Sequence, residues 1–366
     1  MKGQWIGKYI GDHKGEIIIN IDELSNNYGG VAYLIPEDRK IPTVAGLFNT
    51  LDKSNNFTLK TYVIMPINPQ TGVAINWKQI RSAYPGYEIP LEAIGNGEFT
   101  ETKLTLEINT SLKSKFECSL KKKKSNFKST LKSEAKTWEE YKEIVSKYTE
   151  NSFIYRGQRK TWRLRTAFHR HGRYDLTRFL TLDIPTLHKN LSAKTKHIFN
   201  LEIPSENGAF FNLVQHHGYP TPLLDWTHSP YVAAFFAFHK LPKETTSKDG
   251  RVRILIFDKE LWENHWKQLQ VLNTAGLHLS INEFLAIEND RLVPQQAVTT
   301  ITNIDDIESY IQNKEKIRKC QYLRAIDIDA TERNKVLKEL AHMGITAGSL
   351  FPGLDGACSE LREKHF

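Results

Sequence analysis

Hydrophobic and polar residues alternate along the first third of the chain, as they do in strands that bury one face. Turn-forming residues such as Asn26-Asn27 and Gly95-Asn96-Gly97 separate these segments. Strands are therefore expected at residues 16–21, 30–35, 57–67, 72–77 and 103–112. Many short strands with regular turns predict an all-β sandwich or barrel domain over residues 1–118. No group of catalytic residue types lies there, so an accessory or regulatory role is expected.

From residue 137 onward, helical periodicity alternates irregularly with short apolar strands. Thr137-Trp138-Glu139-Glu140 is a capping box and predicts a helix to about Tyr148. Further helices are expected within 186–217, the second capped by Ser205, at 262–270, after a capping box at 280–283, and at 331–343. Strands are expected at 153–158, 223–226, 251–257 and 322–328. Such an order of elements predicts an α+β domain over residues 137–366.

The stretch from Gln215 to Phe238 has the most unusual composition. A helix is expected to end at Gly218, and the prolines that follow favour a turn into a short strand. Ser229 then caps a second helix with Pro230 at its first position. This helix is apolar almost all round, which predicts burial. Polar residues crowd the junction, where they must be hydrogen-bonded or functional: His216, His217, Asp225, Thr227, His228 and Ser229.

Arginines cluster just after the strand predicted at 153–158. Arg156 lies where that strand leaves the core, and Gly157 permits close approach of another backbone or of a ligand. Four more arginines follow in a loop-like region: Arg163, Arg165, Arg170 and Arg173. Because a guanidinium group pairs with two oxygens at once, the cluster favours anionic groups, above all phosphates. The alternative is a solvated basic loop.

The net charge of +8 is concentrated in one segment. From Lys113 to Lys136 there are nine lysines and two acidic residues, which supply +7 of that charge. The Lys- and Ser-rich part, residues 119–136, is predicted to be the linker between the domains. We expect either a solvated linker or an electrostatic contact with RNA or DNA.

The remaining sequence features restrict the class of protein. Three widely spaced cysteines argue against a disulfide framework. Neither a secretory signal nor an uncharged stretch of membrane-spanning length is found, so a cytoplasmic protein that does not bind membranes is expected. The phosphate-binding glycine motifs and the nucleophile elbow are absent. The histidines lack accompanying ligands at suitable spacing, so no metal is predicted.

Four segments together resemble the FRG-domain family. They are Tyr155-Arg156-Gly157-Gln158, QHHGYPTPLLDWTHSPYVAAFFAF at 215–238, Pro294-Gln295-Gln296, and LFPGLDG at 350–356. The resemblance covers about residues 135–366, in the family's order. Tyr155 replaces the Phe for which the family is named. The family is distantly similar to ADP-ribosyltransferases, which implies a split-sheet domain that holds NAD, as a substrate, in a cleft.

The resemblance also implies roles for individual residues. Arg156 would hold the phosphate or ribose of NAD, while Thr227 and Ser229 would orient the nicotinamide ribose. Gln295 or Gln296 falls where the transferases carry their catalytic Glu. Further cofactor contacts are implied for residues of the same motifs and the arginine cluster: Gly157, Gln158, Arg165, His216, His217, Tyr219, Thr221 and Trp226.

The glutamines leave two functions open. A neutral amide cannot stabilise the developing oxocarbenium ion as a carboxylate does. Catalysis would then need another carboxylate, and Asp225 is the candidate. Alternatively, Asp225 has a structural role. One expected function is therefore an ADP-ribosyltransferase that acts as a toxin or antiviral effector, with an antitoxin or regulatory protein as a partner. The other is a non-catalytic module that binds a nucleotide or nucleic acid, with the β-domain as its sensor.

Overall fold

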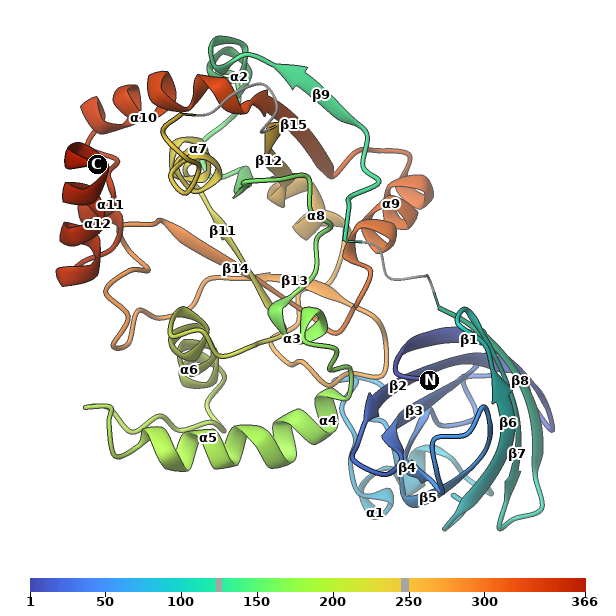
Figure 1. The fold of residues 1–366 in the computed structure, drawn as a ribbon. Coiled ribbons are helices and arrows are strands. Elements are labelled where there is room, and N and C mark those ends of the chain that lie inside the picture. The colour runs from blue at the N-terminus through green and yellow to red at the C-terminus, as the bar shows by residue number, and fades with distance from the viewer. Residues whose placement is uncertain (123–126, 245–249) are drawn as a thin grey trace.

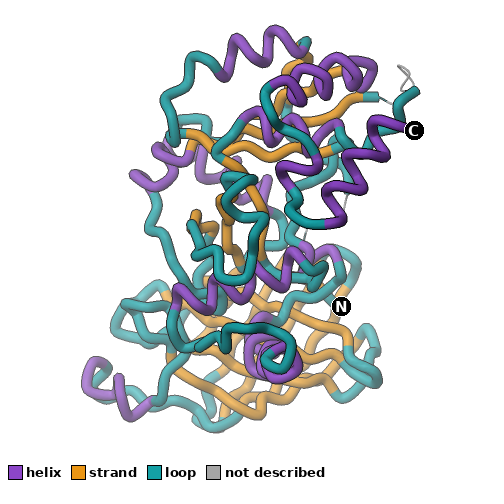
Figure 2. The backbone as a smooth tube through the Cα atoms, turned by 90° about the vertical axis from the view of Figure 1, so that its left-hand side faces the viewer, coloured by secondary structure: helices purple, strands orange, loops and turns teal. Residues whose placement is uncertain are grey.

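A computed structural model describes residues 1–122, 127–244 and 250–366 of the chain. It contains an antiparallel barrel at the N-terminus and a mixed sheet flanked by helices after it (Figure 1). Figure 2 shows strands gathered in the lower part of the molecule and helices with strands in the upper part. The α+β expectation is confirmed, and of the two predicted β architectures the barrel is the one that forms. No helix within the described residues has the length and apolar character needed to cross a membrane.

The barrel closes because each strand pairs with the next and β8 pairs with β1. Inward-facing side chains such as Trp5, Ile19, Phe48 and Leu106 fill much of its interior. Its strands are β1 (Gly3–Gly11), β2 (Gly15–Glu23), β3 (Tyr28–Pro36), β4 (Val44–Thr50), β5 (Asn56–Pro66), β6 (Ala93–Phe99), β7 (Lys103–Thr110) and β8 (Lys115–Lys121). The long β5–β6 connection carries α1 (Trp77–Ile80) and η1 (Arg81–Ala83).

One predicted strand of this domain was wrong. Residues 72–76 form no strand and Trp77 begins α1; Gly72 has a φ of 75° and closes a turn in which its N–H donates to the carbonyl of Asn68. Only an isolated bridge joins Ala74 to Ile67 there. The sequence analysis also missed four strands: β1, β4 and β6, which have glycines or little alternation, and β8, whose residues do alternate.

The C-terminal sheet has the strand order β13-β14-β11-β10-β12-β15-β9, and β9 is its only parallel member among the described pairings. The strands are β9 (Ser133–Lys136), β10 (Phe153–Gln158), β11 (Leu223–Thr227), β12 (Arg251–Asp258), β13 (Leu279–Asn282), β14 (Ala297–Thr302) and β15 (Leu323–Asp329). The segment predicted as a linker thus includes the end of β8 and all of β9. Residues 123 and 124, part of its lysine run, lie outside the described residues.

Helices cover both faces of this sheet and extend below it (Figure 1). They are α2 (Trp138–Val145), α3 (Ala167–Arg170), α4 (Leu176–Arg178), η2 (Phe179–Asp183), α5 (Ile184–Leu191), α6 (Pro204–His216), α7 (Pro230–Phe238), α8 (Lys259–His265), α9 (Ile307–Arg318), η4 (Ala330–Glu332), α10 (Arg333–His342), α11 (Ala347–Leu350) and α12 (Leu354–His365). The capping box at Thr137 and the cap at Ser229 are both confirmed. The buried helix α7 packs on β10 and β12, as its apolar sequence predicted.

Three helix predictions were wrong in detail. The residues of the expected capping box at 280–283 lie instead in β13, where the buried Ser280 hydroxyl accepts the N–H of Leu269. Helix α6 begins at Pro204 after Ile203, not at Ser205. Helix α8 starts earlier than predicted, because Asp258 caps it, and it ends at His265 rather than at residue 270. Helix α9 was not predicted at all.

Candidate functional site

A gap between β10 and β11 forms the centre of the candidate site. These neighbouring strands share one residue pair, Tyr155 with Thr227, whereas β10 and β12 share six. Beyond Tyr155 the two strands therefore diverge. The Arg156 side chain spans the gap and donates a hydrogen bond to the backbone carbonyl of Asp225. One side-chain contact thus replaces the backbone ladder that the strands would otherwise continue.

A pocket of about 560 Å³ opens at this gap. Its walls come from β10, β11, α7 and the segments around residues 162, 291 and 351. Nine of the residues predicted for the site line this pocket: Arg156, Gly157, Gln158, Arg165, His216, Asp225, Trp226, Thr227 and Gln295. The other five do not line it: His217, Tyr219, Thr221, Ser229 and Gln296.

Gly157 is required by the packing of α7 against β10. A Cβ atom at this position would lie 1.9 Å from the carbonyl oxygen of Ala233 in α7. The close approach of a second backbone was expected from the sequence, and it brings the α7 residues Ala233 and Phe236 to the pocket wall.

The charged side chains that line the pocket are almost all cationic. Seven arginine and lysine residues contribute to it, and Asp225 is the one carboxylate among its lining residues: Arg156, Arg159, Arg163, Arg165, Arg170, Lys240 and Arg291. Arg159, Arg170 and Lys240 are exposed, and no carboxylate among the described residues lies within ion-pair distance of them. Partial desolvation lowers the pKa of the Arg170 guanidinium, and the nearby Arg165 lowers it further. An anionic ligand would relieve this repulsion.

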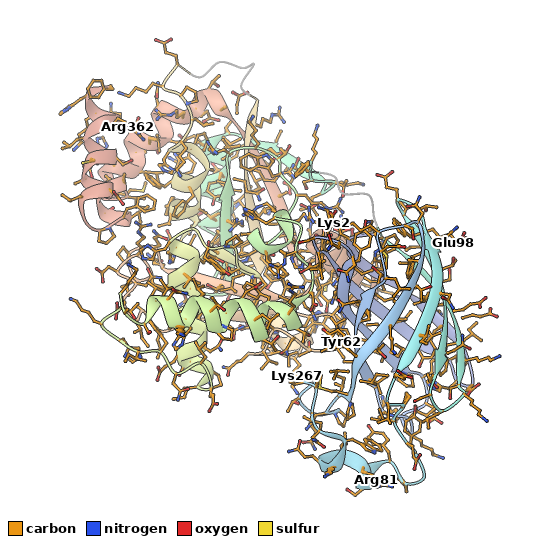
Figure 3. The ribbon with its side chains drawn as sticks, turned by 60° about the horizontal axis from the view of Figure 1, so that its bottom comes forward. Lys2, Tyr62, Arg81, Glu98, Lys267 and Arg362 are labelled. Atoms are coloured by element: carbon orange, nitrogen blue, oxygen red, sulfur yellow. The ribbon has the colours of Figure 1, made fainter. Side chains whose placement is uncertain are left out.

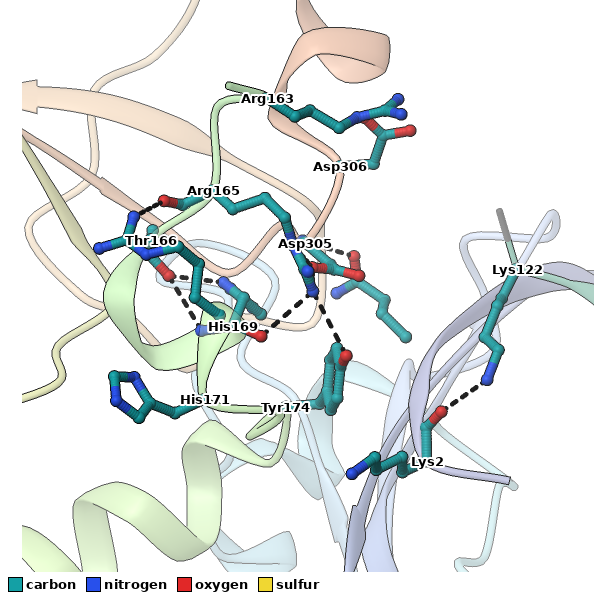
Figure 4. A network of polar contacts seen from close by, with 12 residues as sticks. Lys2, Lys122, Arg163, Arg165, Thr166, His169, His171, Tyr174, Asp305 and Asp306 are labelled. Atoms are coloured by element: carbon teal, nitrogen blue, oxygen red, sulfur yellow. Dashed lines mark hydrogen bonds and ion pairs between the residues drawn. The ribbon is translucent and has the colours of Figure 1, made fainter. Parts of the chain in front are cut away.

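Arg165 and Arg163 are held by the scaffold instead (Figure 4). Arg165 forms an ion pair with Asp305 and donates to the carbonyl of His169 at 3.1 Å and to the Tyr174 hydroxyl at 3.3 Å. Arg163 donates twice to a single carboxylate oxygen of Asp306. These two arginines therefore shape the wall and contribute a largely compensated charge.

Three buried polar atoms around the pocket have no hydrogen-bond partner among the described residues. They are Nε of Arg156, Oε1 of Gln158 and Nδ1 of His239. Burial lowers the pKa of His239 to about 4, so this imidazole is neutral at pH 7. Buried polar groups without partners are costly, and their convergence on one pocket is typical of a site completed by a ligand.

Asp225 is oriented by a short chain of side chains. The Thr221 hydroxyl donates to the carbonyl oxygen of the Gln215 amide, and the Gln215 amide nitrogen donates to the Asp225 carboxylate. Thr221 was expected to contact the cofactor. It is instead linked through Gln215 to Asp225, the one carboxylate among the lining residues.

The two hydroxyls expected to orient a ribose are occupied by backbone contacts. Thr227 donates to the carbonyl of Gln295 at 2.7 Å and accepts the N–H of Ser229 at 3.0 Å. Ser229 accepts the N–H of Val232 as the cap of α7. These contacts fix the junction of β11 and α7, and they already occupy both hydroxyl groups.

The two glutamines take different positions. Gln295 is buried and lines the pocket, where its amide nitrogen donates to the carbonyl of Leu350 at 2.9 Å. Gln296 is exposed, has a φ of 45°, and contributes a backbone carbonyl that accepts the N–H of His228. Gln295 is therefore the one that can contact a bound molecule.

Residues 151–246 match the family model of the FRG domain. The chain contains an FRG domain. The match spans β10 to the end of α7 and includes Arg156, Asp225 and His239. Comparison of the chain with curated proteins and with solved structures gave no match. Three other polar residues also line the pocket. Lys240 follows α7 within the matched segment, whereas Arg291 and Gln295 lie outside it.

Sequence reasoning missed several residues at the pocket of the FRG domain. Phe127 and Trp162 are 73% and 40% exposed at its rim, and Arg159 lies over the Trp162 ring. Arg291 lies over the Phe351 ring. The pairing of exposed aromatics with arginines is a usable signal for Trp162, which lies three residues after Arg159. For Arg291 and Phe351 no local signal exists, because 60 residues of sequence separate them from each other.

Among the described residues no group of side chains is arranged to hold a metal ion.

Proposed function

We propose that the FRG-domain pocket binds a phosphate-bearing nucleotide, and that NAD is its ligand. The observation that carries the proposal is the convergence of the unpartnered Arg156, Gln158 and His239 atoms on a pocket with one carboxylate and seven cationic residues. Oxygen atoms of a phosphate or ribose satisfy the Arg156 donor, and a hydroxyl or amide N–H satisfies the Gln158 acceptor.

Size and shape support a nucleotide over a free phosphate. The volume of about 560 Å³ is within the usual range for sites that bind drug-sized ligands. Aromatic side chains at the rim and wall offer stacking surfaces for a base or a nicotinamide ring: Phe127, Trp162, Phe236 and Phe351. The distant similarity of FRG domains to ADP-ribosyltransferases favours NAD among nucleotides.

The proposed reaction is transfer of ADP-ribose from NAD. The bond between the nicotinamide nitrogen and C1′ of the ribose breaks, and nicotinamide leaves with the electron pair. The acceptor then bonds to C1′ and loses a proton. In this proposal the Asp225 carboxylate, fixed by Gln215, stabilises the positive charge that develops on the ribose. Gln295 supplies hydrogen bonding alone.

A second candidate function is nucleotide binding without turnover. It is favoured by Gln295, because an amide stands among the pocket residues where the transferases carry a glutamate, and its nitrogen is already bound to Leu350. In that case the FRG domain is a recognition module, and the bound nucleotide is released unchanged.

Calorimetry with NAD and with ADP-ribose tests the binding step. Arg170→Ala is the informative variant, since the hydrogen bond it removes goes to the Arg165 backbone carbonyl, in a loop outside the strands. We expect it to weaken binding by about tenfold, as loss of a charge-assisted contact does. Arg81→Ala, on the exposed β5–β6 connection of the barrel, is the matched control and should bind as the wild type does. Absence of binding to the wild-type chain, or equal binding by Arg170→Ala, contradicts the proposal.

Release of nicotinamide, measured by chromatography with bulk RNA, DNA or protein as acceptor, separates the two functions. The transferase proposal requires release by the wild type and its loss in Asp225→Asn, with binding of NAD retained. Binding without release, in the presence of every acceptor, identifies the non-catalytic module.

The lysine-rich segment supports RNA or DNA as a partner of this activity, in the setting of a toxin or antiviral effector controlled by an antitoxin or regulatory protein. Its described lysines are spread over the molecule: Lys113 lies at the β7–β8 turn, Lys121 ends β8, and Lys136 pairs with Glu140 in α2. A nucleic acid held by such charges should show affinity that falls steeply with salt. A variant with Lys121 to Lys124 changed to serine should reduce that salt slope; an unchanged slope identifies the segment as a linker only.

A further inference from the structure

The barrel has an open cavity of its own at one end. Its volume is about 260 Å³. The four connections β1–β2, β3–β4, β5–β6 and β7–β8 all contribute to its mouth, through residues such as His13, Pro42, Tyr87 and Leu112. Figure 3 shows Arg81, in the β5–β6 connection, and Glu98, next to the β6–β7 turn, at opposite ends of the barrel. The cavity therefore opens away from the β6–β7 end.

The choice of side chains leaves this half of the barrel empty. Large residues fill the other half and do not line the cavity: Trp5, Tyr28, Phe57, Leu104 and Leu120. In the open half the inward positions carry small residues instead, including Ala32, Gly46 and Ala93. Gly46 has an ordinary backbone conformation, so no turn requires a glycine there. The effect of the missing side chain is to enlarge the cavity. Eight-stranded barrels have interiors that side chains can just fill or that hold one small ligand.

The polar groups in the cavity favour a neutral ligand. No lysine or arginine among the described residues lines it, while Asp12 and Glu88 lie at its mouth. An anionic molecule such as a fatty acid would thus meet repulsion and no counter-charge. His13 shares a hydrogen bond of 3.0 Å with the Tyr9 hydroxyl, and its ring packs edge-on to Phe116. Burial lowers the pKa of His13, so the imidazole is a neutral hydrogen-bonding group.

We propose that the open half of the barrel binds a small neutral molecule with one or two rings and one hydrogen-bonding group. The apolar walls formed by Leu34, Phe48, Leu106 and Phe116 cover its rings, and His13 contacts its polar group. The size follows from the volume, because a dry cavity of about 150 Å³ accommodates benzene, whereas drug-sized ligands occupy about 300 Å³ or more. The site is independent of the nucleotide proposed for the FRG domain.

Strand β3 lies between this cavity and the C-terminal part. Its inward residues Ala32 and Leu34 line the cavity, while its outward residues Val31 and Tyr33 form a buried cluster with Ala275 of the C-terminal part. A ligand in the barrel thus lies one strand away from the domain interface.

Titration calorimetry of the full chain with indole and 1-naphthol, and with decanoate as the anionic comparison, tests the proposal. The two neutral probes should bind and raise the unfolding temperature, while decanoate should bind at least about tenfold more weakly. Gly46→Leu fills the cavity and should weaken indole binding by at least about tenfold. Thr105→Leu adds the same side chain to the outward side of β7 and should bind indole as the wild type does.

Circular dichroism confirms that each variant is folded, and Ala93→Val provides a smaller filling change if Gly46→Leu is not. The proposal is overturned if neither neutral probe binds the wild-type chain. Indole binding that persists in both folded filling variants also overturns it, because the probe then occupies another place. Preference for decanoate over indole overturns the assignment of a neutral ligand.

Discussion

A single methyl group decides how closely β10 can lie against α7. At Gly157 the α7 backbone comes so near that any Cβ atom would overlap the Ala233 carbonyl oxygen. The same contact fixes the spacing between the strand that carries Arg156 and the helix that carries Phe236 and His239. The residue that gives the pocket its geometry is thus one without a side chain.

Gly157→Ala should lower the free energy of unfolding by about 1–3 kcal/mol, because overpacking forces the backbones apart. Denaturant unfolding measures this change. Gly276→Ala is the matched control, since no heavy atom lies within 4 Å of its Cβ position. That variant should stay within about 0.5 kcal/mol of the wild type. Equal effects of the two substitutions would show that α7 can move away from β10 at no cost.

At the scale of elements, the sheet is held together unevenly. It is weakest between β10 and β11, where one residue pair connects the strands, and this weakness creates the pocket. It is reinforced between β12 and β15 by a buried ion pair in which Arg253 donates to both oxygens of Asp327, at 2.7 and 2.8 Å. Asp327 also accepts the Ser133 hydroxyl and so attaches β9 to the edge.

Asp327→Ala should lower the free energy of unfolding by about 3–5 kcal/mol, because it leaves the Arg253 charge buried without a partner. The double variant Arg253→Met with Asp327→Leu should recover most of this loss, since both charges are removed together. Chemical denaturation of both variants measures the difference. Glu37→Ala breaks an exposed pair with Lys14 and should change stability by less than about 1 kcal/mol. A double variant as unstable as the single one would mean that the ion pair itself, and not its desolvation, stabilises the sheet.

At the scale of the whole molecule, the barrel and the C-terminal part share a polar and an apolar interface. The carboxylate of Asp22, in β2, accepts hydrogen bonds from the Arg173 side chain and from the backbone N–H groups of Tyr174 and Asp175. Gln4 in β1 donates to the carbonyl of Asn303 and accepts the N–H of Asp305. The lysine-rich connection is therefore not the only link between the two parts.

Asp22→Ala should lower the free energy of unfolding by at least about 2 kcal/mol, because it leaves buried N–H groups without an acceptor. Calorimetry should then resolve two thermal transitions, as the barrel and the C-terminal part lose their coupling. Asp22→Asn retains one acceptor oxygen and should have a smaller effect. One unshifted transition in Asp22→Ala would show that the apolar cluster alone holds the interface.

The same interface predicts a dependence of stability on pH. The pKa of Asp175 is raised to about 6, chiefly by burial and also by the nearby Asp22, although the Arg178 N–H and Arg173 act to lower it. The folded chain therefore holds this proton more tightly than the unfolded chain, whose carboxyl has a pKa near 4. The contribution of Asp175 is full below pH 4 and is lost as the pH rises through 6, by about 3 kcal/mol.

Asp175→Asn should remove this loss, since the amide does not ionise and can still accept the N–H of Arg178 as the cap of α4. As the pH rises from 4 to 7, the free energy of unfolding of the variant should increase relative to that of the wild type. Denaturant titrations at several pH values measure it, and groups common to both proteins cancel. A difference that does not change with pH would show that Asp175 has the same pKa in the folded and the unfolded chain.

The sequence by itself determined the elements with strong local signals. The cap at Ser229, the all-apolar α7, the strand ending at Gln158 and the close approach at Gly157 follow from residue types at short spacing, because caps, helix faces and glycine contacts are local in the chain. The FRG resemblance rested on these segments together with residues 294–296 and 350–356, and the family model matches it over residues 151–246.

Only the tertiary structure decided which of those residues form a pocket. Thr227 binds the backbone carbonyl of Gln295, Gln295 rather than Gln296 faces inward, and Arg165 pairs with Asp305. The same local sequence permits either orientation in each case. The outcome depends on partners 55 to 140 residues away that satisfy buried donors and acceptors, and no pattern along the chain specifies which partner is near. The barrel cavity is likewise set by which inward positions are small on strands that meet only in three dimensions.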